Sequence, residues 1–348
     1  MQNRANIFGY KTPYSYLCTN KTKQPLRTPQ RKGQLQTSMN TNKSLTELTN
    51  EILTARMSAN KKQEALVKLG VTPYEAMVLA RASMPLPTPR GHRTRPAIFT
   101  YTFGVEIECV GCCYTDFFNA ARRNGLSVYD QVYYNHRDMP QYKLTTDRSI
   151  NGTNPAECVT PALNSTDGFE SLQACCNSLR EIGATANSSC GLHVHIGAAS
   201  LTDQEYCNVF VNYMRLETAI ESFLAPSRRG RNARWCASLR KHEYAVLDAT
   251  TKNDMRAALD NNRYHSVNAN AYSAHSTIEF RQHQGSTNFT KISHWVKFLG
   301  KLVEFSKTNR LTENIDRIED IPFLTQTEKN WFASRRREFE ARTGRRVA

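Results

Sequence analysis

The clearest pattern in the chain is an alternation of apolar and polar residues between positions 98 and 110. A two-residue period is typical of a β-strand, because successive side chains in a strand point to opposite faces. Here Val105 and Ile107 fall on one face, and Glu106 and Glu108 fall on the other. We therefore predict a strand with one apolar face against a core and one face that carries two carboxylates.

The same period returns in two later segments of the chain. Each of them again places two polar side chains between apolar neighbours, so that the polar pair shares one face. Three strands are thus expected to present polar pairs to one side. The later pairs are His193 with His195 in segment 191–197, and Glu279 with Arg281 in segment 276–283.

Between the strands, the apolar spacing changes to the three-and-four-residue period of amphipathic helices. In the helix that follows Thr202, the apolar side chains form one stripe and are expected to be core. Short strands that alternate with such helices are an α+β pattern. The predicted strands are 98–110, 156–160, 191–197, 264–272 and 276–283, and the main predicted helices are 166–182, 203–224 and 290–306.

Composition divides the chain into five parts. The first is polar, has no acidic residue and shows no apolar period, so we expect it to be disordered. The second has helical spacing, the third is proline-rich as linkers often are, and the last contains a charged helix that begins at Thr325. The predicted parts are a basic tail 1–43, a small helical segment 44–84, a proline-rich linker 85–97, a main domain 98–310 and a charged helical extension 311–348.

The positive charge of the chain lies mainly in its first part. Residues 1–96 carry 16 Lys and Arg against 4 Asp and Glu, which accounts for most of the net charge of +15. A cationic tail of this kind can hold nucleic acid or an acidic partner by screened electrostatics, or it can serve only to keep the chain soluble. We therefore keep nucleic acid as a possible partner of residues 1–43.

No stretch of the sequence approaches the roughly 20 apolar residues that a membrane helix needs. The amino terminus also lacks the apolar segment of a signal peptide, so we expect a cytoplasmic protein. The ten cysteines include two adjacent pairs and suit reduced thiols better than a disulfide framework.

The paired polar residues of the three strands are candidate metal ligands. Carboxylates side by side repel each other, and their burial is costly unless a cation or water accompanies them. Each pair alone also fits an ordinary half-exposed strand, a hydrogen-bonded core or a salt bridge, but together the pairs favour a site for divalent cations and phosphates. Glu157, in strand 156–160, is a further candidate ligand. Asp147 lies in a turn, where it either accepts backbone N–H bonds or takes part in chemistry.

An arginine-rich loop, 226–236, follows the long helix 203–224. Guanidinium groups pair bidentately with phosphates, so such a loop can hold a phosphorylated ligand. A solvated basic loop has the same composition, and the loop by itself does not separate the two interpretations.

The order of these motifs resembles that of the amidoligase family, a branch of the superfamily of glutamine synthetase and γ-glutamylcysteine synthetase. The motifs are Gly-Val-Glu-Ile-Glu, Asp-Arg-Ser with Glu-Cys-Val-Thr-Pro, Cys-Gly-Leu-His-Val-His, Pro-Ser-Arg-Arg, Arg-Tyr-His-Ser-Val-Asn and Ile-Glu-Phe-Arg-Gln-His-Gln-Gly-Ser. The resemblance covers about residues 98–308. It implies a curved antiparallel sheet with helices on its outer face, as in the catalytic domain of glutamine synthetase.

The resemblance also implies an activity. A carboxylate would be activated by transfer of the γ-phosphoryl group of ATP, and an amine would then displace the phosphate to form an amide, with Mg²⁺ or Mn²⁺ as the cofactor. The substrates would be a carboxylate and an amine on small molecules, peptides or protein side chains. Asn268 and Arg263 would lie on the substrate side. The implied metal ligands are Glu106, Glu108, Glu157, His193 and Glu279, the implied nucleotide or phosphate contacts are His195, Arg228 and Arg281, and the candidate catalytic residues are Arg281 and Asp147.

Two other functions remain open at this point. A metal-dependent hydrolase could use His193 and His195 without any nucleotide. An inactive ligase-like protein could bind nucleic acid through residues 1–43, and its binding would then depend steeply on salt.

Overall fold

A computed structural model of the protein describes residues 44–55, 57, 59–82, 100–132, 137–230 and 233–343. The chain forms two compact units, residues 1–91 and 92–348. The predicted tail 1–43 and the proline-rich linker 85–97 lie outside the described residues.

The first unit contains three short helices where the apolar spacing predicts them: α1 (Leu45–Thr54), α2 (Ala59–Lys68) and α3 (Pro73–Ala82). Ser44 caps α1 by a reciprocal pair of hydrogen bonds with Glu47, which satisfies backbone N–H groups that a helix start leaves without partners. A small core of Leu66, Ala76 and Ala80 joins α2 to α3.

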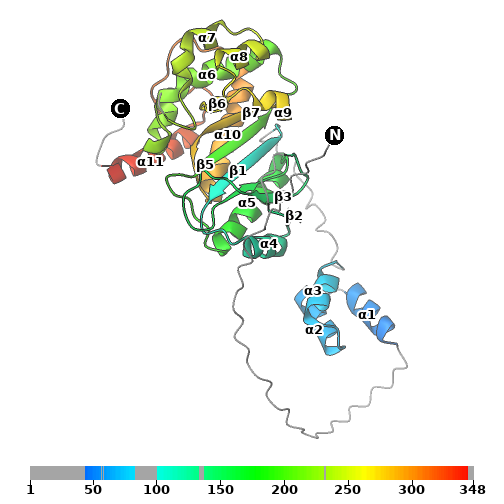
Figure 1. The fold of residues 1–348 in the computed structure, drawn as a ribbon. Helices are drawn as coiled ribbons and strands as arrows, with labels where there is room; N and C mark the ends of the chain where they lie inside the picture. Colours follow the sequence, from blue (N-terminus) through cyan, green and yellow to red (C-terminus); the bar gives the residue numbers. More distant parts are fainter. Residues whose placement is uncertain are drawn as a thin grey trace, which may run out of the picture. The chain divides into compact units, whose positions relative to one another are not determined.

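The second unit is built on a seven-stranded sheet with the order β2-β3-β4-β1-β5-β7-β6, shown in Figure 1. Every pair of neighbouring strands is antiparallel except the edge pair β2–β3, which is parallel. The strands are β1 (Phe103–Cys109), β2 (Val128–Tyr129), β3 (Tyr142–Thr145), β4 (Ala156–Val159), β5 (Gly191–Gly197), β6 (Val267–Asn268) and β7 (Thr277–Gln284).

The sheet corrects two expectations. It is mixed rather than wholly antiparallel, because β2 and β3 pair in parallel at its edge. The predicted strand 264–272 is only the two-residue β6, and the chain then turns into the short helix α9 (Ala271–His275). The α+β class itself is confirmed.

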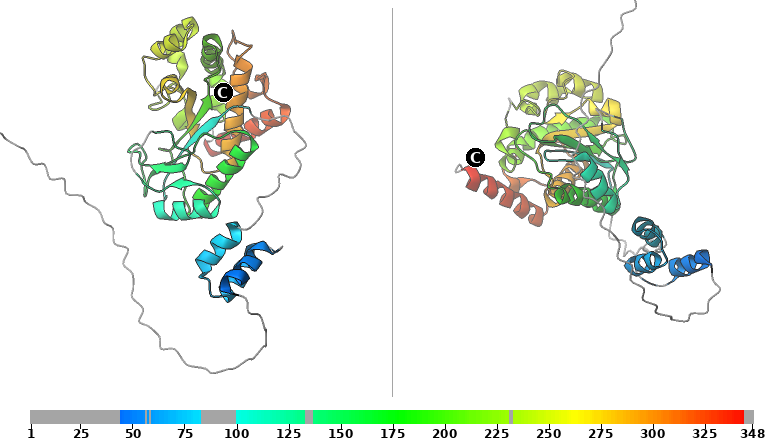
Figure 2. Two further views of the ribbon diagram at one scale, coloured as in Figure 1. Left: turned by 90° about the vertical axis from the view of Figure 1, so that its right-hand side faces the viewer. Right: turned by 60° about the horizontal axis from the view of Figure 1, so that its bottom comes forward.

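One face of the sheet is covered by α5 (Ser165–Glu181), α6 (Asp203–Ser222) and α10 (Phe289–Ser306). Figure 2 shows α10, in orange, and α5, in green, along the same side of the sheet. The apolar stripe of α6 is buried as expected, including Phe210 and Tyr213. Side chains from this face of the strands and from the three helices form one continuous core, whose burial is the main stabilising contribution to such a domain.

The remaining elements extend this core at its ends. Helix α11 (Gln326–Thr343) begins where Thr325 and Glu328 cap it, and its Phe332 packs against Phe298 of α10. The segment 311–343 is thus part of the main core. The other elements are α4 (Tyr114–Arg123), α7 (Glu243–Asp248), α8 (Lys252–Ala258), η1 (Pro226–Arg228), η2 (Leu239–His242) and η3 (Ile318–Asp320).

Across the described parts of the chain, no helix is both long and apolar enough to span a membrane. The cysteines in these parts are free thiols, and most of them are buried.

Candidate metal and phosphate site

The register of the sheet brings the predicted polar residues together on the face that the core helices leave uncovered. Glu106 pairs with His193 across β1 and β5, and Glu108 pairs with Glu157 across β1 and β4. Glu279 on β7 pairs with His195 on β5. Directly paired residues in antiparallel strands have neighbouring side chains on one face, so three separate sequence motifs become one cluster.

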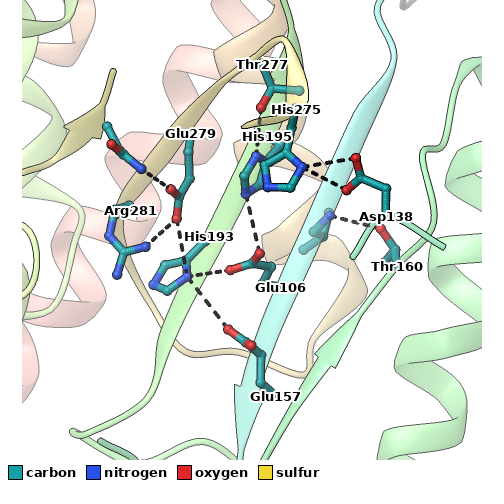
Figure 3. Close-up of polar contacts among 12 residues, drawn as sticks. Glu106, Asp138, Glu157, Thr160, His193, His195, His275, Thr277, Glu279 and Arg281 are labelled. Atoms are coloured by element: carbon teal, nitrogen blue, oxygen red, sulfur yellow. Dashed lines mark hydrogen bonds and ion pairs between the residues drawn. The ribbon is translucent and has the colours of Figure 1, made fainter. Parts of the chain in front are cut away.

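His193 lies at the centre of this cluster, as Figure 3 shows. Its Nδ1 lies 2.9 Å from an oxygen of Glu106, 3.7 Å from Glu279 and 4.0 Å from Glu157. Its Nε2 lies 3.5 Å from an oxygen of Glu108. One imidazole is therefore surrounded by four carboxylates, all of which the sequence predicts as metal ligands.

The cluster offers groups of ligand atoms close enough to share a cation. Three groups have their atoms within 4.8 Å of one another. The chemistry of these donors, mostly carboxylate oxygens with imidazole, suits hard cations such as Mg²⁺ or Mn²⁺. The groups are Glu106 with His195 and Glu279, Glu106 with Glu157 and His193, and Glu108 with Asp147 and Glu157.

His195, two residues after His193 on the same face of β5, supports this fit. Its Nδ1 lies 2.9 Å from the hydroxyl of Thr277, whereas its Nε2 is buried and has no hydrogen-bond partner in the described structure. That Nε2 lies 3.5 Å from Glu106 Oε1. A buried ring nitrogen that has no hydrogen bond and lies beside a carboxylate is a donor atom that fits a shared metal ion.

Glu106 and Glu157 have opposite pKa shifts. Burial alone would raise the pKa of Glu106, but the neighbouring imidazoles of His193 and His195 lower it well below its usual range. Burial raises the pKa of Glu157 well above its usual range, and the negative charges of Glu106 and Glu108 raise it further. A proton on Glu157 would therefore compete with a divalent cation for this site.

Glu279 is held by two side chains. Arg281 donates a hydrogen bond to its Oε1, and Asn268 donates one to its Oε2 at 2.6 Å. Burial opposes ionisation of Glu279, but Arg281 together with His195 and His193 outweighs it, and the pKa of Glu279 is lowered. Asn268, predicted on the substrate side, thus fixes a carboxylate of the cluster.

Asp147 fits both of the roles left open by its position in a turn. Its Oδ1 accepts the backbone N–H of Ser149 at 2.6 Å, which is ordinary turn chemistry. It also lies with Glu108 and Glu157 in one of the three candidate metal groups. The structure therefore brings Asp147 to the edge of the cluster.

Arg228, in the arginine-rich loop, is buried and only 4% exposed. It packs over Gly191 so closely that a Cβ at that position would lie 2.7 Å from a guanidinium nitrogen, so the glycine makes room for it. The neighbouring Arg229 turns away and donates to the backbone oxygen of Leu224. Only part of the loop thus faces the site, and Arg231 lies outside the described residues.

A cavity of about 840 Å³ opens over the cluster. Its wall combines all of the predicted ligands with arginines and two aromatic rings. Sequence reasoning missed these aromatic residues, which come from separate loops and show no periodic pattern. Besides the cluster, the lining includes Asp147, Arg148, Arg228, Trp235, Arg263, Tyr264, Asn268, Ala274, His275 and Arg281.

A second cavity of about 580 Å³ adjoins the first. Both cavities are lined by Glu106, Glu157, His195 and His275. His275 Nδ1 lies 2.9 Å from Asp138 Oδ1, as Figure 3 shows. Neither residue was predicted, because the two are far apart in the sequence and neither belongs to a recognisable motif.

Fold and site together define an α+β protein with a buried carboxylate–imidazole centre next to two cavities. A family model described as "Putative amidoligase enzyme" matches residues 100–303, more than half of the chain. The chain therefore belongs to this amidoligase family, the family of amide-forming ligases that its motifs resemble. No curated protein matches it.

Proposed function

We propose that the protein is an ATP-dependent carboxylate–amine ligase that works with Mg²⁺ or Mn²⁺. The observation that carries this proposal is the convergence of four glutamates on His193 beneath one cavity. Most of this cluster is buried, and uncompensated carboxylates at such density are costly. The family membership supports a ligase, and we extend it to a glutamine synthetase-like fold.

Bound metal ions would neutralise phosphate oxygens and orient the γ-phosphoryl group for transfer. Glu106, Glu108, Glu157, His193 and Glu279 would hold them. Arg281 and Arg228 are both buried in the same cavity wall, and their guanidinium groups would contact the phosphoryl oxygens. His195 would contact either a metal ion or a phosphate.

The reaction balances without any further reactant. A carboxylate oxygen of the substrate attacks the γ-phosphorus of ATP, the bond to ADP breaks, and an acyl phosphate forms. The amine nitrogen then attacks the carbonyl carbon, phosphate leaves, and the nitrogen gives up a proton. Arg281 would stabilise the charge that develops on the transferring phosphoryl group.

The two cavities support a division between the substrates. The first is rich in arginine and contains the candidate metal ligands, so we assign it to the nucleotide. The second is bounded in part by Met139, Pro140 and Pro161 and includes the buried Lys143, so we assign it to an organic substrate. A substrate in the second cavity would meet the phosphates at the shared wall around Glu106.

The proposal is tested by measuring ADP and phosphate release from ATP with Mg²⁺ or Mn²⁺ and pooled carboxylates and amines. We expect release that requires both pools and is lost in Glu279→Gln. The matched control is Glu313→Gln, an exposed glutamate that lines neither cavity. A folded, metal-loaded protein that neither binds nor cleaves ATP would refute the ligase, and turnover of a substrate without ATP would favour a hydrolase.

A second pair of variants tests the division of the cavities. Ala274 lines the first cavity and Ala162 lines the second, and both are exposed. Ala274→Trp is expected to weaken ATP binding, whereas Ala162→Trp is expected to leave ATP binding unchanged and to raise KM for an organic substrate. Loss of ATP binding in Ala162→Trp alone would reverse the assignment.

A further inference from the structure

Two aromatic rings stand in the wall of the first cavity beside the candidate phosphate contacts. Trp235 and Tyr264 lie with their ring centroids 5.1 Å apart and their planes at 68°. Both residues are half-buried and both line the cavity. Aromatic rings that face a polar, arginine-rich cavity are stabilised less than rings in the core would be, and apolar surface in a cavity often marks a binding site.

Backbone hydrogen bonds hold the two segments that carry these rings next to each other. The segments that carry them run side by side, with Ala237 N–H bonded to the oxygen of Tyr264 at 2.9 Å and Ser266 N–H bonded to the oxygen of Ala237 at 2.8 Å. Glu217 of α6 fixes both segments from behind, since it accepts hydrogen bonds from Leu239 N–H and from the Ser266 hydroxyl. The pair is thus built into the fold before any ligand arrives.

The pair is connected to the phosphate end of the site through Arg281. The Arg281 guanidinium carbon lies 6.0 Å from the centroid of the Tyr264 ring, and its Nε donates to the backbone oxygen of Trp235 at 3.4 Å. The same arginine donates to Glu279 in the carboxylate cluster. The carboxylate cluster, Arg281 and the aromatic rings therefore follow one another along the cavity wall. This order matches a nucleotide that has its phosphates at the cluster and its base at the rings.

Two exposed arginines lie over these rings. The Arg234 guanidinium is 4.5 Å from the centroid of Trp235, and that of Arg263 is 5.3 Å from the centroid of Tyr264. Guanidinium planes and aromatic faces are the two surfaces on which nucleic-acid bases stack in proteins. An exposed arginine can move aside for a base or stack on its other face.

We infer that Trp235 and Tyr264, with Arg234 and Arg263, form the binding site for the purine base of the nucleotide. This inference rests on the proposed function, which it deepens by assigning the base end of the nucleotide site. These stacking residues would favour purines over pyrimidines, because a purine has the larger ring area. Stacking is otherwise tolerant of base identity, so the site would separate ATP from GTP only weakly.

The test compares ATP with inorganic tripolyphosphate, which has the phosphates but no base, by calorimetry in the presence of Mg²⁺. In the double variant Trp235→Leu/Tyr264→Leu we expect ATP affinity to fall about 10- to 100-fold, since each lost base stack is worth that order of affinity. Tripolyphosphate affinity should change by less than about twofold. ATP should also quench the fluorescence of Trp235, and tripolyphosphate should not.

Three further proteins complete the comparison. Tyr244→Leu replaces a tyrosine that is 87% exposed and lines neither cavity, and it should bind ATP normally. Trp235→Phe and Tyr264→Phe keep an aromatic face and should retain most of the affinity, which separates stacking from misfolding. In the unaltered protein, ATP and GTP should bind more tightly than CTP and UTP.

The outcomes separate this inference from the proposed function. If the double variant binds ATP as tightly as the unaltered protein, the assignment of the base site is wrong and the ligase proposal stands. If the affinity for tripolyphosphate falls as much as the affinity for ATP, the rings only support the phosphate site and the assignment is again wrong. If the unaltered protein binds neither ligand, the assignment of the base site and the proposed function both fail.

Discussion

The two faces of the central sheet are formed by the same strands, yet they contribute in opposite ways. On the helix side, residues such as Ile107 and Val194 are completely buried in the core. On the other side, their immediate neighbours Glu106 and His193 face the cavity. One face therefore stabilises the fold. The other places buried charges close together at a cost in stability, as sites for metals and phosphates often do.

The largest expected effect comes from the cavity face. Glu106→Gln removes the carboxylate that approaches both His193 and His195. We expect the affinity for Mn²⁺ to fall by at least about 100-fold, because mutation of a residue that only supports a metal ligand can already lower metal affinity by up to about 100-fold. Calorimetric titration of the metal-free protein measures this. Unchanged Mn²⁺ affinity would mean that the cluster is not a metal site.

The matching change on the helix face is Ile107→Ala, one residue further along the same strand. It leaves a cavity in the core, so the free energy of unfolding should fall by about 2–5 kcal/mol. Urea denaturation measures the loss. The folded fraction should still bind Mn²⁺ within about threefold of normal, and a much larger loss of binding would show that the two faces are not independent.

The dependence of metal binding on pH sharpens the comparison further. The raised pKa of Glu157 means that a proton competes with the metal, so Mn²⁺ affinity should decrease as pH falls below that pKa, by up to about tenfold per pH unit. Titrations in buffers of different ionisation enthalpy should detect the released proton. Glu157→Gln should flatten this dependence, and an equally steep profile in the variant would assign the proton to another group.

The smallest expected effect is on the metal-free fold. Because the pKa of Glu157 is raised on folding, its contribution to stability is lost as pH rises from the unfolded value through the folded pKa. At pH 8, Glu157→Gln should therefore stabilise the metal-free protein by about 1 kcal/mol, as substitutions at functional residues can. Thermal unfolding with a chelator present tests this, and a destabilised variant would contradict the idea that this face costs stability.

The sequence was most informative where a single strand carries its own signal. In β1 and β5 the apolar and polar residues alternate along the whole strand, and in β7 they alternate from Thr277 to Arg281, so the strands and the polar faces could be predicted. Glu106, His193 and Glu279 were identified in this way. The short strands β2 and β3 and the helix α4 were missed, because two to four residues give too little periodicity and because α4 lies in a region with no other marker.

Residues that meet only through long-range contacts could not be predicted. The pair of His275 with Asp138, and that of Trp235 with Tyr264, each join segments that carry no common motif. Segment 264–272 also contains enough apolar residues to suggest a strand, but the chain turns into α9 after Asn268 to close over the cavity edge. Local propensity is overridden there by tertiary packing.

The sequence by itself determined the α+β class, the family and the side chains that each long strand presents to one face. It could do so because strand periodicity and motif order are local properties of the chain. Only the tertiary structure decided which strands are neighbours, that β2 and β3 are parallel, and that four glutamates surround one histidine beside two cavities. Those features depend on register and on contacts between distant segments, which the packing of the whole core fixes.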